Sequence, residues 1–144
     1  MNAEDTLAKV ELFSEMPRRD LGRLAKLAVM RGFKKGEPIV KEGESGIGFY
    51  VISEGRVEVV KGAGSESEVV LASLGPESFF GEMSFFENSP RSATVRAVED
   101  TECLVLTRWD FQAEVNRPGS RIAIAMLPVL ARRIRNLDQA ATHH

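Results

Sequence analysis

The feature that most limits the fold of this chain is a series of glycines that divides residues 29–108 into short apolar segments. In one segment, Val57 and Val59 alternate with Arg56 and Glu58, which is the pattern of a half-buried strand. Strands this short and evenly spaced are typical of a small antiparallel barrel or jelly roll. The predicted strands cover about 29–34, 38–41, 49–53, 56–61, 69–71, 93–97 and 102–106, and the dividing glycines are Gly36, Gly43, Gly46, Gly48, Gly55, Gly75 and Gly81.

Helical patterns precede this β region. Apolar residues recur at helical spacing within residues 3–28, and Pro17 is placed to open the second of two helices there. We expect Leu12 and Phe13 to pack in the elbow between these helices.

Residues 108–139 are predicted to be helical as well. Pro118 suits the first turn of a helix, whereas Pro128 removes an internal hydrogen bond and should kink the helix that contains it. The apolar stripe of this region consists of Ile122, Met126, Val129, Leu130, Ile134 and Leu137. We therefore expect one mainly β domain over 1–144, an antiparallel β-roll at 29–108 with N-terminal helices at 1–28 and C-terminal helices at 108–139.

Composition excludes several function classes. A net charge of −2 gives no general attraction to nucleic acid, and no apolar run approaches the about 20 residues that span a bilayer. The only histidines are His143 and His144, so a histidine metal cluster or a Ser-His pair is missing and we expect no enzyme and no metal. The single cysteine, Cys103, lies in an apolar run and should be buried, which fits a cytoplasmic protein.

Residues 79–95 carry the strongest chemical signal. Gly81 lets the backbone approach a ligand, and a carboxylate at Glu82 can accept a hydrogen bond from a sugar hydroxyl. Free amides of a helical turn at 82–86 and the planar fork of Arg91 can bind anionic oxygens. This spacing predicts a site for a sugar phosphate.

The same stretch resembles the phosphate-binding cassette of the cyclic nucleotide-binding domain family, through Phe80-Gly81-Glu82-Met83 and Pro90-Arg91-Ser92-Ala93-Thr94-Val95. That family includes catabolite activator proteins, regulatory subunits of cyclic-AMP-dependent kinase and some ion channels. The resemblance covers roughly residues 10–138. Its upstream parts, which resemble the roll turns and glycine-marked hairpin of the family, are Phe33 with Gly36-Glu37, Glu42-Gly43-Glu44, Phe49-Tyr50-Val51-Ile52 and Gly55-Arg56-Val57-Glu58-Val59.

The resemblance implies a role for each matching residue. The backbone of Gly81 would approach the ribose, Glu82 would accept from the ribose 2′-hydroxyl, and Arg91 would pair with the exocyclic phosphate oxygens. The remaining cassette residues implied in ligand binding are Met83, Ser92 and Ala93, the last two through backbone amides.

Outside the cassette, the resemblance implies contacts to the base and to a lid. Val59 and Leu71, pointing into the roll, would press on the base. The terminal helix would close over the pocket, and Arg133 falls where the lid of an activator protein reaches the ligand. Val59 and Leu71 have a simpler alternative as plain core, and Arg133 has one as part of a solvated basic face.

Cyclic AMP is the favoured ligand because the activator proteins share the Arg91-Ser92-Ala93 sequence, while a serine after the arginine leaves cyclic GMP as an alternative. We expect a stand-alone sensor, because no helix-turn-helix follows the lid. Its signal would pass to an unknown protein partner, or to a second copy, through the C-terminal helix. Two further alternatives are a degenerate roll that serves as a protein scaffold, and a DNA-binding regulator suggested by Arg132, Arg133 and Arg135.

Overall fold

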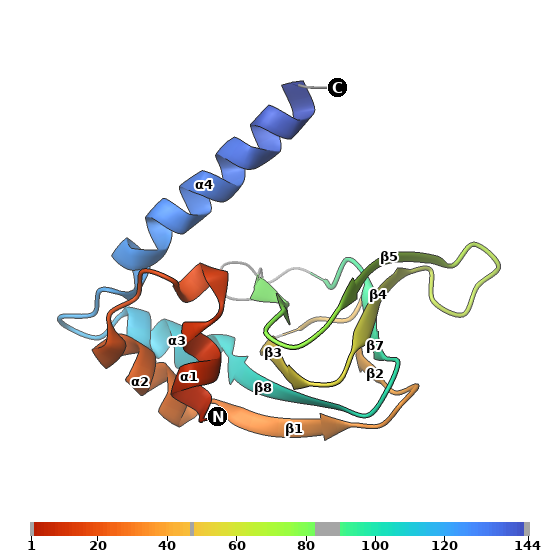
Figure 1. Cartoon of the computed structure of the whole chain (residues 1–144), viewed down its shortest axis with the longest axis horizontal. Helices are drawn as coiled ribbons and strands as arrows, with labels where there is room; N and C mark the ends of the chain where they lie inside the picture. The colour runs from red at the N-terminus through yellow and green to blue at the C-terminus, as the bar shows by residue number, and fades with distance from the viewer. Residues whose placement is uncertain (1, 47, 83–89, 143–144) are drawn as a thin grey trace.

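The structure is a computed structural model that describes residues 2–46, 48–82 and 90–142. Two four-stranded antiparallel sheets form a β-roll, and helices from both ends of the chain gather at one end of it (Figure 1). The mainly β architecture with flanking helices that the sequence predicts is confirmed.

The first sheet lies between the helices and the interior of the roll. Its strand order is β1 (Val29–Phe33), β8 (Thr101–Thr107), β3 (Gly48–Glu54) and β6 (Phe79–Phe80). Because side chains alternate along a strand, Phe49 and Val51 of β3 pack in the helical core, whereas Tyr50 and Ile52 pack in the core of the roll. The sheet therefore separates two apolar cores.

The second sheet closes the roll and carries a β-bulge. Its order is β2 (Pro38–Val40), β7 (Thr94–Ala97), β4 (Val57–Lys61) and β5 (Val69–Leu74). Val59 pairs with Ala72 and Val60 pairs with Val70, so Leu71 is an extra residue on β5. The bulge lies on the edge strand of this sheet.

The N-terminal helices are α1 (Ala3–Ala8), the 3-10 turn η1 (Glu11–Phe13) and α2 (Arg18–Leu27). Pro17 directly precedes α2, and Leu12 and Phe13 are fully buried, as the sequence predicts. The C-terminal helices are α3 (Arg108–Val115), which Thr107 caps by accepting from the Asp110 amide, and α4 (Ile122–Thr142).

Of the two predictions made from prolines in the C-terminal region, the one for Pro118 was wrong, and the kink at Pro128 stays a prediction. Pro118 lies in the turn between α3 and α4, followed by Gly119 at φ 82°, and so opens no helix. Helix α4 continues through Pro128 without interruption. The carbonyl that loses its bond there belongs to Ile124, whose side chain is exposed, so water at that face can replace the missing donor.

The apolar stripe of α4 is divided between core and solvent. Ile122, Met126 and Val129 are buried against the helical core, but Ile134 is 61% and Leu137 is 71% exposed. Figure 1 shows the second half of α4 extending away from the other helices. No helix in the described ranges has the length and apolar character needed to cross a membrane.

Candidate functional site

The backbone of Arg91 is fixed by the loop that follows β2. The amide of Gly43 donates to the Arg91 carbonyl at 2.8 Å, and the amide of Arg91 donates to the Glu44 carbonyl at 2.9 Å. Ser45 and Pro90 form a β-bridge beside these bonds. These bonds and the neighbouring bridge therefore hold the backbone of Arg91 in place.

The guanidinium of Arg91 lies in a space that only glycines leave open. Its Nη2 donates to the Gly48 carbonyl at 2.8 Å. A Cβ at Gly46 would overlap the guanidinium, and a Cβ at Gly81 would lie 2.7 Å from Nη1. Gly81 also has a φ of 85°, which favours glycine.

In the described part of the chain, the buried guanidinium of Arg91 has fewer hydrogen-bond acceptors than donors around it. The Nε of Arg91 is buried and has no hydrogen-bond partner within the described ranges. Burial also lowers the pKa of Arg91, against the smaller opposing effects of Tyr50 and Glu82. A half-buried guanidinium with an unpaired N–H is stabilised by an anion that supplies an acceptor.

Glu82, the predicted ribose acceptor, is next to Arg133 of α4. Its Oε1 lies 3.8 Å from the Arg133 Nη1, and Arg133 Nε lies 4.0 Å from Glu11 Oε1. The Arg133 guanidinium also stacks over the Phe79 ring at 5.0 Å. Arg133 thus links α4 both to Glu82 and to β6.

Ser92 and Ala93 follow Arg91 at the entrance to β7. Ser92 is exposed and Ala93 is half-buried. The Ser92 carbonyl accepts from Lys61 Nζ at 2.7 Å, and Lys61 also lies 3.4 Å from Glu42. The hydrogen bond from Lys61 fixes the peptide that begins at Ser92, which orients the amide of Ala93.

The two residues expected at the base differ in environment. Val59 packs against the core of the roll, whereas Leu71, the bulged residue, is 57% exposed. Val69 and Val70 beside it on β5 are exposed as well. An apolar surface therefore stands open at this edge of the roll.

A cavity of about 380 Å³ adjoins Arg91, which is one of its lining residues. Tyr50, which stacks on Phe80 at 4.9 Å, forms part of its wall, and burial raises the pKa of Tyr50. Val59 and Leu71 do not line it. The cavity therefore includes Arg91 but not the two residues that the resemblance implies at the base.

Sequence reasoning named Arg91, Glu82 and Gly81 as candidate site residues but did not name the residues that position them in the structure. Gly46 and Gly48 shape the space around Arg91, and Lys61 holds the Ser92 peptide. The only signal for the first two was their place in a glycine-rich loop. Met83 and the helical turn expected at 82–86 lie, from residue 83 on, outside the described residues.

Sequence comparisons support the family resemblance. The model of the cyclic nucleotide-binding domain matches residues 30–117. The chain is 39% identical over 108 residues to the cyclic AMP receptor protein of Thermus thermophilus, a match that covers 75% of this chain and 50% of that protein. It is 37% identical over 112 residues to the cAMP-dependent protein kinase regulatory subunit of Dictyostelium discoideum, which covers 75% and 34% respectively. The chain thus spans half or less of the length of these two relatives.

Solved structures share the fold. The N-terminal domain of a transcriptional regulator from Streptomyces coelicolor A3(2) matches with a TM-score of 0.83 and 31% identity, over 95% of both chains. The catabolite activator protein of Thermus thermophilus matches with a TM-score of 0.75 and 33% identity, over 92% of this chain and 62% of that one. Both bear out the β-roll with helices at its ends.

Proposed function

Because this chain belongs to the cyclic nucleotide-binding domain family, we propose that it binds cyclic AMP through Arg91 and Glu82 and acts as a regulatory module. The observation that carries this proposal is the state of Arg91. Its backbone is held by a loop from a distant part of the chain, and its half-buried guanidinium has a buried N–H without an acceptor among the residues that the structure describes. A cyclic phosphate supplies two anionic oxygens to such a group.

Several observations favour cyclic AMP over cyclic GMP. The Arg91-Ser92-Ala93 sequence resembles that of the activator proteins, and the relatives from Thermus and Dictyostelium are named for cyclic AMP or for catabolite activation. A purine base would lie against Val59 and Leu71, and the open apolar surface on β5 leaves room for it. Cyclic GMP is the alternative ligand, since the Ser92 hydroxyl is also a hydrogen-bonding group for guanine.

Calorimetric titration of the chain with cyclic AMP and with cyclic GMP tests this proposal. We expect binding of both with a preference for cyclic AMP. Arg91→Ala should weaken binding by about 10- to 150-fold, because a charge-assisted hydrogen bond contributes about 1.5–3 kcal/mol. Arg96→Ala is the matched control, since Arg96 is paired with Glu68 and Glu58 on the sheet. Equal affinity of the wild type and Arg91→Ala would contradict the assigned phosphate contact.

We also propose that the module signals by rearranging α4. Arg133 of α4 lies against Glu82 in this structure, and a ribose hydroxyl on Glu82 would compete for the same carboxylate. Ligand binding would then change how α4 is held, provided that the ligand prefers one position of α4. Hydrogen exchange of residues 122–137 with and without cyclic AMP measures this, and identical protection would rule it out.

The exposed half of α4 suggests where the signal goes. Ile134 and Leu137 are largely exposed on the part of α4 that extends from the domain. An unknown protein partner or a second copy of the chain would cover these side chains. Sedimentation of wild type and Leu137→Glu separates the two, since only self-association through this face would make the wild type the heavier species.

A second candidate is a protein scaffold that binds no nucleotide. The same exposed face of α4 favours it, because that face offers a protein contact whether or not a ligand is bound. The absence of heat with either nucleotide at millimolar concentration would select this function over the first.

A further inference from the structure

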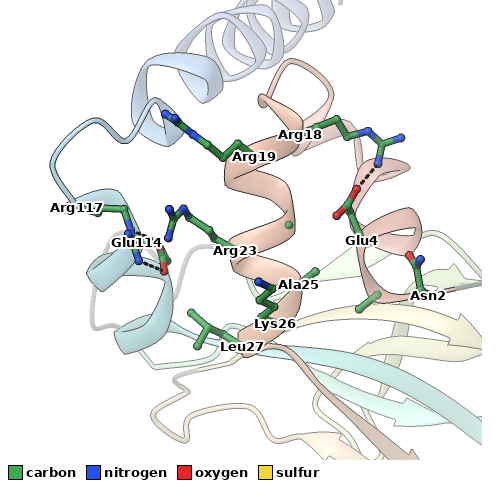
Figure 2. Close-up of a pocket in the computed structure, with 12 residues that line it drawn as sticks. Asn2, Glu4, Arg18, Arg19, Arg23, Ala25, Lys26, Leu27, Glu114 and Arg117 are labelled. Atoms are coloured by element: carbon green, nitrogen blue, oxygen red, sulfur yellow. Dashed lines mark hydrogen bonds and ion pairs between the residues drawn. The ribbon is translucent and has the colours of Figure 1, made fainter.

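Helix α2 carries a group of basic side chains on a face that the nucleotide site does not use. Figure 2 shows Arg23 on α2 directed toward Glu114 and Arg117 at the end of α3, and Arg19 one turn away on the same side of α2. These residues line a broad concavity of about 710 Å³ between α1, α2 and α3. The basic residues that line it are Arg18, Arg19, Arg23, Lys26 and Arg117.

The concavity is basic although the chain as a whole is acidic. Five basic residues and two carboxylates, Glu4 and Glu114, line it, so its net charge is 5 − 2 = +3. The whole chain has a net charge of −2, and all other residues together therefore carry −5. We call this concavity the α2 groove.

Three of its cations lack a counter-charge. Arg18 pairs with Glu4 at 3.2 Å and Arg117 pairs with Glu114 at 2.9 Å. Arg19, Arg23 and Lys26, in contrast, make no ion pair with any residue in the described part of the chain. They follow one another at i, i+4 and i+7 and so form one row on the helix.

This row is unfavourable for an isolated helix. Like charges at i and i+4 destabilise a helix, and cations in its first turn oppose the positive end of the helix dipole. Asp20, the acidic residue of that turn, does not offset them at the surface, because it is buried and accepts a hydrogen bond from the Arg121 amide. A bound anion would remove both sources of destabilisation.

The surroundings of the row select the kind of anion. Ala3, Ala25 and Leu27 contribute apolar surface to the groove, and Leu27 is 36% exposed. Glu4 and Glu114 lie at its two sides, and the rest of the chain is negative, so a long polyanion or an anionic membrane would be repelled beyond the groove. The row from Arg19 to Lys26 is only about 10 Å long at about 1.5 Å per residue.

We propose that the α2 groove docks a short acidic segment of a partner protein, with two or three carboxylates spaced to meet Arg19, Arg23 and Lys26 and an apolar side chain against Leu27. The Asp20–Arg121 hydrogen bond ties α2 to the residue that precedes α4, so a segment docked here lies next to the base of the proposed signalling helix. The proposal does not depend on nucleotide binding.

A direct binding experiment tests it on the full chain without nucleotide. The probe is a fluorescein-labelled 12-residue peptide of glutamate and leucine, with glutamates at i, i+4 and i+7, and its counterpart with glutamine in place of glutamate. Fluorescence anisotropy should show binding of the acidic peptide alone. The Arg19→Glu, Arg23→Glu, Lys26→Glu triple variant should lose at least about tenfold in affinity, since exposed ion pairs contribute up to about 1 kcal/mol each.

The matched control is Lys34→Glu, Lys35→Glu, Lys41→Glu, which changes the charge equally on exposed lysines outside the groove. Equal loss in both variants, or no peptide binding up to 1 mM (about the weakest affinity worth assigning), would overturn the proposal. Tighter binding of a 12-nucleotide DNA strand or of phosphatidylserine vesicles would overturn it in favour of a nucleic acid or a membrane. A charge-reversed variant can fold poorly. The same comparison is therefore repeated with a neutral triple variant whose melting temperature is unchanged, Arg19→Gln, Arg23→Gln, Lys26→Gln.

Discussion

Gly46→Ala is the substitution that isolates the shape of the Arg91 site from the stability of the domain. A Cβ at this position would overlap the Arg91 guanidinium, whereas the backbone of Gly46 lies outside the positive-φ region that requires glycine. The alanine is therefore compatible with the local backbone but not with the present place of the arginine side chain.

The size of the effect follows from the contacts that Arg91 would give up. If the guanidinium moves, it loses its hydrogen bond to the Gly48 carbonyl and its alignment with a phosphate. Losing one charge-assisted bond to the ligand costs about 1.5–3 kcal/mol, which is about 10- to 150-fold in the dissociation constant for cyclic AMP. The free energy of unfolding should stay within about 1 kcal/mol, because replacing glycine by alanine at an unstrained position restricts the unfolded chain.

The assay pairs calorimetric titration with urea denaturation on the same protein. Gly32→Ala is the matched control, since a Cβ there meets nothing within 4 Å, so the affinity should not change and the free energy of unfolding should stay within about 1 kcal/mol of wild type. The expected pattern is a loss of affinity without a loss of stability in Gly46→Ala alone. An affinity within twofold of wild type would show that the guanidinium does not occupy the space above Gly46 when the ligand is bound, and would refute the role assigned to that space.

Two further predictions concern the link to α4 and the buried thiol. In Arg133→Ala, amide exchange in 129–137 should be about 2- to 5-fold faster without ligand, because the stack on Phe79 and the contact with Glu82 are lost; Arg135→Ala is the control, and an equal increase in both would contradict the link. Cys103 should react with thiol reagents only on unfolding, because burial raises its pKa from 9.0 to about 12. The thiol loses its proton near pH 9.0 in the unfolded chain but only near pH 12 in the folded chain, so its contribution to the free energy of unfolding is fully present below pH 9.0 and is lost as pH rises toward 12. Urea midpoints of the wild type should therefore fall in that range more than those of Cys103→Ala.

The strands and the central candidate site residues can be predicted from the sequence because both signals are local. Alternation along β4 and the order of Gly81, Glu82 and Arg91 are local, so a short window contains the whole signal. The contact between Gly46 and Arg91 joins residues far apart in the sequence, and a glycine in a loop is equally typical of an ordinary turn. The tolerance of Pro128 depends on which side of α4 faces solvent, and periodicity alone could not determine that side because apolar residues occur on both.

The contacts between the nucleotide site and α4 limit how far a ligand alone can shift this module. Among the residues that the structure describes, these contacts are the 3.8 Å contact between Glu82 and Arg133 and the stack of Arg133 on Phe79, which together amount to about 1–2 kcal/mol for partly exposed groups. A ligand that replaces these two contacts changes the equilibrium of α4 by about 5- to 30-fold through them.

Burial of Ile134 and Leu137 by a partner contributes on the same scale or more, at about 1–2 kcal/mol for each side chain because most of its area is still exposed. A response to nucleotide that is small in the isolated chain should therefore grow when a partner covers this face, because the partner and the ligand then favour the same position of α4. By reciprocity, the partner should tighten nucleotide binding by the same factor, so measuring the cyclic AMP affinity with and without the partner tests the coupling from either side.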